Sequence, residues 1–218
     1  GTRFHPSYPY YKYWSEYVDY NYYAQTYSQG YDSPPGAISI GPACPSVQIV
    51  DCEFGENFTF GNGGAADVYS DTLFARCRFG GNQSEISGGA VFSDAREFRA
   101  GFAGALAQLT FDECSFLENE ANAGGAVYLY NTKATFQDSH VVGNLAQNGG
   151  GLWLSDTEVV FTGGSIAGNV ASVYDAQGGG IAAFGTVLTV ADCVLQGNRA
   201  EGQGSFGGAL SLYGGDDT

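Results

Sequence analysis

Residues 111–131 read FDECSFLENEANAGGAVYLYN. The stretch holds a Phe-x-x-Asn motif at Phe116 and Asn119, followed by a Gly-Gly-Ala-aliphatic motif that begins at Gly124. Both motifs recur along the chain, and recurrence at intervals of roughly 20 to 50 residues is the sequence signature of a repeat architecture. The stretch is therefore one unit of a repeat protein.

Six units align when the position of Cys114 is taken as the reference. These register positions are Cys52, Cys77, Cys114, Ser139, Gly164 and Cys193. Five residues after each of them stands an asparagine: Asn57, Asn82, Asn119, Asn144, Asn169 and Asn198. Two residues after each stands an apolar side chain: Phe54, Phe79, Phe116, Val141, Ile166 and Leu195. A Gly-Gly pair follows every asparagine, so the whole pattern of the unit repeats.

The segments between these motifs have the composition of short β-strands. Ala126–Tyr130 and Glu158–Phe161 are rich in β-branched and aromatic residues, and their apolar residues alternate with a period of two. Glycines interrupt the stretches that would be long enough for a helix. The repeat therefore predicts an all-β fold, a right-handed parallel β-helix of about six coils that stack about 4.8 Å apart.

Each recurring position has an expected role in such a coil. Asparagine tolerates the left-handed or bridge conformation of a tight corner, and its amide can hydrogen-bond to the asparagines of neighbouring coils. We therefore expect the six asparagines to form a structural ladder at one corner. The Gly-Gly pairs mark a second corner, where φ is positive or a side chain would clash. The apolar positions fill the interior.

Composition limits the partners of the chain. It has 218 residues, of which 44% are hydrophobic, and a net charge of −15. Nucleic acids and anionic lipid surfaces bind basic patches, so we expect neither as a partner. No run of about 18 apolar residues occurs, so we expect no membrane span. The absence of methionine and of an apolar leader predicts a processed secreted chain, located outside the cell or at the cell surface.

Residues 1–36 differ from the repeat domain, which we expect to span residues 37–218, with residues 37–49 as the lead-in to the first coil. The repeat motifs are absent from the first segment, and aromatic residues are frequent in it: Tyr8, Tyr10, Tyr11, Tyr13, Trp14, Tyr17, Tyr20, Tyr22, Tyr23, Tyr27 and Tyr31. Tyrosine is a rigid amphipathic residue that interfaces favour. We therefore expect an extended tyrosine-rich arm that packs on a neighbouring copy, with a disordered low-complexity tail as the alternative.

Several segments depart from the length of the unit. The longest insertion lies between Ser93 and Gln108. Val170–Gln177 and Arg199–Phe206 are longer than their counterparts and belong to successive coils, so they are expected to stack as one ridge. The sequence ends at Thr218, just after the last expected strand, without a recognisable cap. An uncapped coil offers unpaired backbone groups to another strand, which predicts head-to-tail assembly.

Four of the five cysteines occupy register positions. Stacked neighbours such as Cys52 and Cys77 would direct their Cβ atoms in parallel, so the role of small buried apolar residues is expected for most of them. If the chain forms one disulfide, we expect it between Cys44 and Cys52. No Cys-x-x-Cys pair occurs, and His5 and His140 lie far apart, so neither a zinc site nor a cofactor is expected.

Two glycosylation sequons overlap the asparagine ladder. They read Asn57-Phe58-Thr59 and Asn82-Gln83-Ser84, and they would accept a glycan in a secreted eukaryotic protein. An asparagine that is bonded to its neighbours is a poor acceptor, so the ladder role is favoured for both.

An enzyme is the rival class, because parallel β-helices host many polysaccharide lyases and hydrolases. Such sites combine several aspartates with a basic residue on one exposed sheet. Lys12 and Lys133 are the only lysines, and neither recurs with an acidic cluster. A solvated turn explains the recurring aspartates more simply than acid–base catalysis does. We expect no enzymatic activity. The recurring aspartates are Asp51, Asp112, Asp138 and Asp192.

Two sets of motifs carry a family resemblance. Phe54–Asn57, Phe79–Asn82 and Phe116–Asn119 are each followed by a Gly-Gly pair, and the full Gly-Gly-Ala-aliphatic form occurs at Gly88–Val91, Gly124–Val127 and Gly207–Leu210. These motifs resemble the repeats of the chlamydial polymorphic outer-membrane proteins, and similar repeats occur in extracellular proteins of algae and other protists. The resemblance covers roughly residues 47–215. It implies a β-helical passenger domain that acts in surface adhesion and display.

The chain departs from that family in its tyrosine-rich arm and in its later coils, where aliphatic residues replace phenylalanine. We therefore expect an extracellular structural protein that self-associates head to tail into a filament or cell-surface appendage. The alternative is a surface adhesin that binds a glycan or a cell-surface protein as a monomer, and a polysaccharide-acting enzyme comes third.

Overall fold

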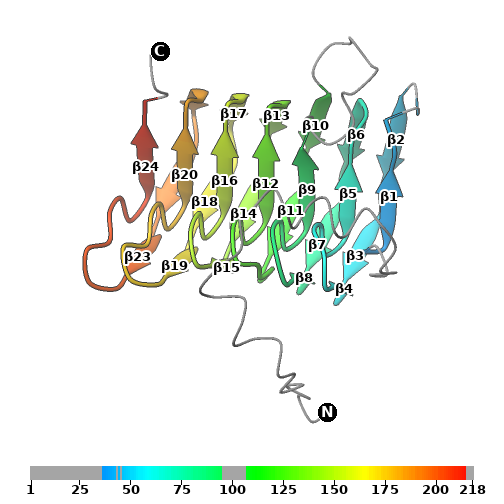
Figure 1. The fold of residues 1–218 in the computed structure, drawn as a ribbon. Coiled ribbons are helices and arrows are strands. Elements are labelled where there is room, and N and C mark those ends of the chain that lie inside the picture. Colours follow the sequence, from blue (N-terminus) through cyan, green and yellow to red (C-terminus); the bar gives the residue numbers. More distant parts are fainter. Residues whose placement is uncertain (1–35, 43, 45, 95–106, 215–218) are drawn as a thin grey trace. The chain divides into compact units, whose positions relative to one another are not determined.

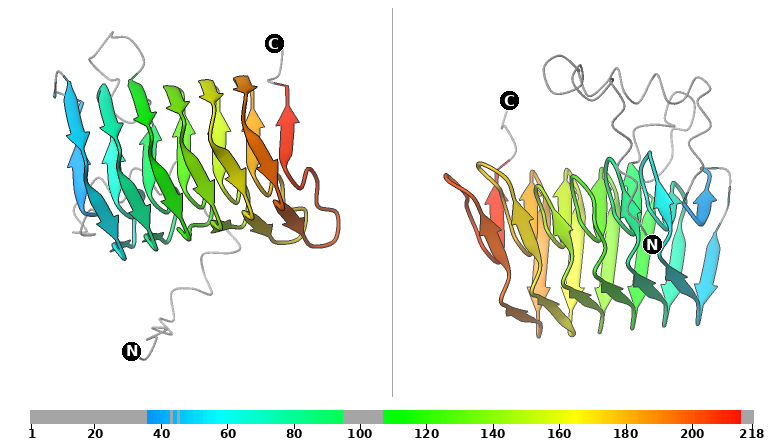
Figure 2. Two further views of the ribbon diagram at one scale, coloured as in Figure 1. Left: turned by 180° about the vertical axis from the view of Figure 1, so that it is seen from behind. Right: turned by 90° about the horizontal axis from the view of Figure 1, so that it is seen from below.

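The computed structural model of the protein describes residues 36–42, 44, 46–94 and 107–214. The regular structure of these residues consists of β-strands, and each strand pairs in parallel with its neighbours (Figure 1). The strands stack as a β-solenoid of about 6 turns, which confirms the predicted parallel β-helix. Figure 2 shows that successive coils follow one another in chain order along the stack.

Three sheets form the faces of the stack. Sheet A contains β1 (Ile38–Ile40), β5 (Ala66–Val68), β9 (Val91–Asp94), β12 (Val127–Tyr130), β16 (Leu152–Ser155), β20 (Ile181–Phe184) and β24 (Leu210–Tyr213). Sheet B contains β2 (Val47–Val50), β6 (Thr72–Ala75), β10 (Gln108–Asp112), β13 (Lys133–Gln137), β17 (Glu158–Thr162) and β21 (Val187–Ala191). Sheet C contains β3 (Glu53–Gly55), β7 (Arg78–Gly80), β11 (Ser115–Leu117), β14 (His140–Val142), β18 (Ser165–Ala167) and β22 (Val194–Gln196).

Shorter strands connect sheet C to sheet A in most coils. β4 (Phe58–Thr59) pairs with β8 (Gln83–Ser84), and a three-stranded sheet contains β15 (Leu145–Ala146), β19 (Val170–Ser172) and β23 (Arg199–Glu201). Each coil thus runs through sheet B, then sheet C, then sheet A. Coil one begins at β2, and coil six ends at β24.

The β-helix begins earlier than the sequence indicated. Residues 37–49 were expected to be a lead-in, yet β1 already pairs with β5, and β2 pairs with β6. The reason is a short alternation that the prolines of this segment interrupt: Ile38, Ile40, Val47 and Ile49 all pack on the core of the stack.

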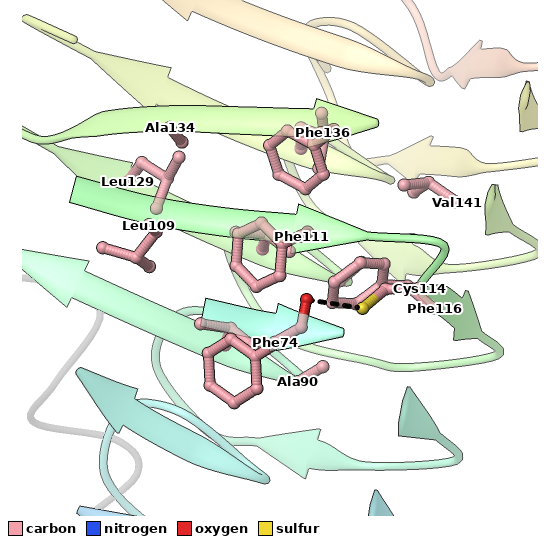
Figure 3. Close-up of a cluster of buried hydrophobic side chains, with 14 of the residues drawn as sticks. Phe74, Ala90, Leu109, Phe111, Cys114, Phe116, Leu129, Ala134, Phe136 and Val141 are labelled. Carbon is pink, nitrogen blue, oxygen red and sulfur yellow. Dashed lines mark hydrogen bonds between the residues drawn. The ribbon is translucent and has the colours of Figure 1, made fainter. Parts of the chain in front are cut away.

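Two neighbouring columns of phenylalanine, both running along the stack, fill much of the interior. The expected column at the second position after the register residue is buried from Phe54 to Ile166. A second column, in sheet B, contains Phe74, Phe111, Phe136 and Phe161, of which Figure 3 labels the first three. Rings within a column stack, as in Phe74–Phe111 with centroids 5.4 Å apart and an angle of 7°. Rings of different columns meet edge to face, as in Phe111–Phe116 at 78°. Each such pair adds about 0.5–1.5 kcal/mol beyond its area burial.

The asparagine corner needs one correction. The residue with positive φ is the one before each ladder asparagine: Glu56, Gly81, Glu118, Gly143, Gly168 and Gly197, with φ between 55° and 69°. The asparagines themselves are not among the described residues with positive φ. The preceding residue makes the turn, so the asparagine side chain can point inward and bond along the stack.

The Gly-Gly corner is as expected. The first glycine of each pair has a φ between 58° and 66°: Gly63, Gly88, Gly124, Gly149, Gly178 and Gly207. The second glycine lies against the backbone of the next coil, since a Cβ on Gly125 would be 2.2 Å from Gly150 O. Side chains are therefore excluded from this corner for two separate reasons.

The ridge expected from the two longer loops is present. Phe206 N–H donates to Ala176 O at 2.9 Å, and Asp175 N–H donates to Gln203 O at 3.0 Å, so the loops of coils five and six pair with each other. Most of the insertion between Ser93 and Gln108 lies outside the described residues.

Gly125→Ala should destabilise the chain by about 2–3 kcal/mol, because the added Cβ overlaps a backbone oxygen that cannot move independently of its coil. Urea unfolding followed by circular dichroism measures this loss. Gly55→Ala is the matched control: its Cβ would have only Gly80 O within 4 Å, at 3.9 Å. The control should remain within about 1 kcal/mol of the wild type, and equal losses in the two variants would contradict the close-approach argument.

Candidate functional site

The six asparagines form one continuous hydrogen-bonded ladder. From coil two onward each Oδ1 accepts two bonds from the asparagine of the preceding coil, one from its backbone N–H and one from its Nδ2, with lengths from 2.8 to 3.1 Å. Each Nδ2 from coil two onward also donates to a carbonyl of the preceding coil, as Asn119 Nδ2 does to Phe79 O at 3.1 Å. The side-chain donors and acceptors of the four central asparagines are therefore all used within the stack, and these four residues are fully buried.

This ladder has a direction. Within the ladder, each asparagine donates from its N–H and Nδ2 to the asparagine of the next coil, and its Oδ1 accepts from the asparagine of the preceding coil. Among the described residues, no hydrogen bond reaches Asn57 Oδ1, and none leaves the backbone N–H of Asn198. Coil one thus presents an acceptor at its outer side, and coil six presents donors.

The outer sides of these two coils carry matching apolar residues. Because strand pairing keeps one register along the stack, each position of coil one has a counterpart in coil six. Read through successive strand pairs, the counterparts are Val47 and Leu188, Ile49 and Val190, Phe54 and Leu195, and Ala66 and Leu210; Ile38 of β1, which precedes coil one, lies in the same column as Ala66. Coil six therefore offers coil one the same kind of surface that every inner coil offers its neighbour.

Coil six is only partly covered. Leu212, which follows the inward column of sheet A, is 59% exposed, whereas its neighbours Leu154 and Ala183 in that column are buried. Leu188, Val190, Leu195 and Leu210 are only partly buried against the core. The described stack therefore ends in an apolar surface with the pattern of a coil interior.

Sheet A carries an aromatic stripe on its outward face, which the sequence reasoning missed. We define this stripe as Tyr69, Phe92, Tyr128, Trp153, Phe184 and Tyr213. Tyr128 and Trp153 stack with centroids 4.4 Å apart at 2°, and Phe184 and Tyr213 with centroids 5.2 Å apart at 7°. The signal in the sequence was an aromatic residue four or six positions after the first glycine of most Gly-Gly pairs.

A shallow trough of about 430 Å³ lies on the outward face of sheet C. Glu53, Glu56, Glu118 and Arg78 line it, together with glycines whose missing side chains open the space. Arg78 Nη1 pairs with Glu53 Oε1 at 3.1 Å, and both side chains are about half exposed or more. The trough can offer hydrogen-bonding carboxylates and one guanidinium to a polar ligand.

The recurring aspartates serve turn geometry at three positions. Asp51, Asp138 and Asp192 all have positive φ, between 46° and 55°. Asp51 also pairs with Arg76 of the next coil, where Arg76 Nε lies 2.7 Å from Asp51 Oδ1. This hydrogen bond lowers the pKa of the Asp51 carboxyl. The fourth aspartate, Asp112, ends strand β10.

Cys77 and Cys114 behave as small buried residues, Cys193 is half-buried, and the two cysteines at the start of the stack are exposed. Cys114 Sγ donates to Phe74 O at 3.4 Å (Figure 3), and Ser139 Oγ makes the same type of bond to Phe111 O at 3.1 Å. Burial raises the pKa of the Cys114 thiol to about 12 and raises that of Cys77.

The expected disulfide between Cys44 and Cys52 is not formed. Both are free, exposed thiols. The physical reason lies in the register position, because the Cys52 thiol is directed to Val50 O at 3.3 Å, as in the other coils.

The two sequon asparagines differ. Asn82 is fully buried and its Nδ2 donates to both Phe54 O and Asn119 Oδ1, so the folded chain has no room for a glycan there. Asn57 is half-buried, and its Nδ2 donates to Asn82 Oδ1 at 2.8 Å. A glycan on Asn57 stays a prediction.

The arm residues from Tyr8 to Tyr31, Trp14 included, lie outside the described residues, so their intersubunit role stays a prediction. The described part of the chain contains no helix that is long and apolar enough to cross a membrane. It also contains no group of three or more potential metal ligands. Comparisons with protein-family models, with curated proteins and with solved structures found no match.

Asn119→Ala should destabilise the chain by about 3 kcal/mol or more. It would leave the donors of Asn82 without their acceptor, and each buried unsatisfied group costs about 1–3 kcal/mol. Chemical denaturation measures the change. Asn122→Ala, an exposed asparagine three residues further on in the same coil, is the control and should change stability by at most about 1 kcal/mol. A small loss at Asn119 would show that the ladder is not a principal source of stability.

The raised pKa of the Cys114 thiol predicts a loss of stability at alkaline pH. The folded pKa is about 12 against an ordinary thiol pKa of 9.0, so the unfolded chain ionises first as the pH rises. The contribution is complete below pH 9 and is lost progressively towards pH 12. Cys114→Ser, which reproduces the arrangement at Ser139, should show a smaller decrease of the unfolding free energy over this range, and parallel pH profiles would refute the assignment.

Proposed function

We propose that the protein is an extracellular structural protein that self-associates head to tail, with coil one of one copy stacked on coil six of the next. In sheet A, β24 of the other copy then takes the place beside β5 that β1 holds within one chain, so this stacking requires β1 to leave that place. The carrying observation is the directed asparagine ladder. In this arrangement Asn198 of one copy donates its N–H and Nδ2 to Asn57 Oδ1 of the next, repeating the bonds found between all inner coils.

Apolar burial supports the same arrangement. The half-covered residues of coil six would face the residues that occupy the same columns in coil one. Burying a large aliphatic side chain contributes about 1.5–3 kcal/mol relative to leaving it in water. A contact between unlike ends of identical molecules is heterologous, and it produces an open filament when its rotation does not close.

Charge repulsion opposes this contact, so the strength of assembly should depend on the salt concentration. Asp192 of coil six occupies the column of Asp51, so the junction brings two carboxylates together where the inner coils place Arg76 beside Asp51. The net charge of −15 adds repulsion between whole copies. We therefore infer that assembly requires screening by salt.

A second candidate function is glycan binding by a monomeric adhesin, and the trough on sheet C favours it. Carboxylates and a guanidinium around an open space suit the hydroxyl groups of a sugar. In that case Glu118→Gln should weaken binding in a glycan array, and binding should not depend on assembly.

Head-to-tail assembly predicts that Leu212→Lys weakens self-association by roughly tenfold or more, because a charge would be buried at the junction. Sedimentation velocity and negative-stain imaging over a concentration series, at about 0.15 M salt, measure this. Leu145→Lys is the matched control: Leu145 is 38% exposed but lies in coil four, away from both ends, and its variant should assemble normally.

The same arrangement predicts that Asp192→Arg strengthens association a few-fold, since it gives Asp51 of the next copy the partner that Arg76 provides within the chain. A wild-type chain that remains monomeric at every concentration and salt condition would refute head-to-tail assembly.

A further inference from the structure

Sheet A has one strand more than the other two faces of the stack. Among the described residues it contains seven strands, whereas sheets B and C contain six each. The additional strand is β1, which precedes coil one and pairs with β5, the sheet A strand of that coil. Sheets B and C end at β2 and β3, whose outer edges have no strand partner in the described part of the chain. In sheet A, by contrast, the outer edge of coil one is already filled.

The sequence of β1 repeats that of the last strand. Residues 36–40 read Gly-Ala-Ile-Ser-Ile, and residues 208–212 read Gly-Ala-Leu-Ser-Leu. Followed through the strand pairs of sheet A, each residue of the first segment lies in the column of its counterpart in the second, as Ile38 does with Leu210. The two segments therefore match in structural position as well as in residue type.

The middle position of β1 and β24 separates these two strands from the others that continue the column. It is serine in both, whereas coils two to five place other residues there: Phe92, Tyr128, Trp153 and Ala182. The neighbour of this position in β5 is Asp67, whose carboxylate accepts a hydrogen bond from Tyr69 OH at 3.1 Å. A serine hydroxyl is small and can donate to a carboxylate, while an aromatic ring at that position would remove the carboxylate from water. The edge of β5 therefore suits the residue pattern that β1 and β24 share.

β1 is a short strand with a small contact surface. Ile38 N–H donates to Ala65 O at 3.0 Å, and Tyr69 N–H donates to Ile40 O at 2.8 Å. Ile40 is 6% exposed, whereas Ile38 is half-buried and Ser39 is exposed. The departure of β1 alone would leave the edge of β5 unpaired, and an unpaired edge is a template for another strand. Replacement of β1 by a similar strand therefore costs less than its simple detachment.

Replacement by β24 of a second copy would preserve the pairing in sheet A and add pairing in the other sheets. β24 offers β5 the same positions that β1 offers. It also belongs to a complete coil, so β21 and β22 of the same copy would reach the open edges of β2 and β3. β1 brings no such strands, but residues 41–46 tether it to coil one, and a short tether gives an effective concentration in the millimolar range. The two strands would therefore compete for one edge.

We propose that the edge of β5 is a binding site for a strand with the pattern Gly-Ala-aliphatic-Ser-aliphatic, which β1 fills within one chain and β24 of a second copy fills in the assembly. The assignment rests on the proposed head-to-tail function and adds its control. β1 is a built-in competitor that keeps single copies apart until their concentration makes the exchange favourable. Strand addition of this kind takes its affinity from backbone hydrogen bonds and its specificity from alternate side chains.

Ile40→Ser tests the competition, because it weakens β1 and changes no residue of coil six. Sedimentation velocity measures the concentration at which half of the chain is assembled, and this concentration should fall about fivefold or more, since a larger fraction of the chain has a free β5 edge. Ile49→Ser is the matched control: Ile49 lies in β2, at the junction, and is not displaced, so its variant should raise the same concentration. Circular dichroism checks that both variants are folded. A folded Ile40→Ser chain that assembles no better than the wild type would overturn the competition.

The wild-type chain gives an independent measurement. A synthetic peptide with the sequence of residues 207–214 carries the strand of coil six without the rest of that coil. At millimolar concentration it should bind the edge of β5 and release β1, which NMR detects as faster hydrogen exchange of the Ile38 N–H. The same peptide with Leu212→Lys is the control and should leave this exchange unchanged. Assembly of the wild-type chain without peptide should also accelerate the exchange of the Ile38 N–H.

The outcomes separate the strand site from the assembly on which it rests. A chain that never sediments as an assembly, yet loses protection of the Ile38 N–H with the peptide, would refute head-to-tail association and leave the strand site intact. Assemblies that Leu212→Lys still weakens, but in which the Ile38 N–H stays as protected as in single copies, would overturn the exchange and retain an association through coil six. Equal effects of the two peptides, or no effect of either, would overturn the strand site.

Discussion

The stack depends on one constraint: a coil that turns sharply three times must satisfy the polar groups that each corner leaves without a partner in its own coil. At the asparagine corner a single amide does so. Its oxygen accepts from the backbone and side chain of one neighbouring coil, and its nitrogen donates to a carbonyl of that coil and to the amide of the other. No other uncharged side chain of that length combines two donors with a two-fold acceptor. The corner therefore fixes the residue type, and the residue type fixes the register of all three sheets.

The same reasoning explains what the sequence could and could not predict. The ladder and the Gly-Gly corner were predictable because they depend on backbone geometry, which the same residue must serve in every coil. At the asparagine corner, the residue with positive φ was assigned one position too late. That residue is Glu in two coils and Gly in four, and only glycine indicates a positive φ from the sequence alone. The first coil was placed too late for a similar reason, since prolines hide the alternation that begins at Ile38.

Features that depend on side-chain packing between coils were less visible. The aromatic stripe changes position within its strand, from Trp153 in coil four to Phe184 in coil five, where Ala182 takes the site beside Trp153. A column that shifts by two residues conserves the outward face but breaks a strict positional pattern. The trough on sheet C is open because glycines line it and carry no side chains. The sequence reasoning assigned glycines to turns and so did not predict the trough. The thiol at Cys52 is held by the same backbone carbonyl pattern as its buried equivalents, so the spacing between two cysteines could not reveal that it stays free.

A ladder with a direction also limits how such a chain can associate. Each coil has an acceptor side and a donor side, so two copies stacked through like ends would oppose donors to donors or acceptors to acceptors. Stacking through unlike ends would instead repeat the donor and acceptor pairs of the ladder, so the ladder would favour open growth over a closed dimer in the proposed assembly. The residues that vary between coils would then decide how strong that growth is. In the column of Asp51, Arg76 of coil two pairs with Asp51 within the chain, whereas Asp192 of coil six would repel Asp51 of the next copy at the proposed junction.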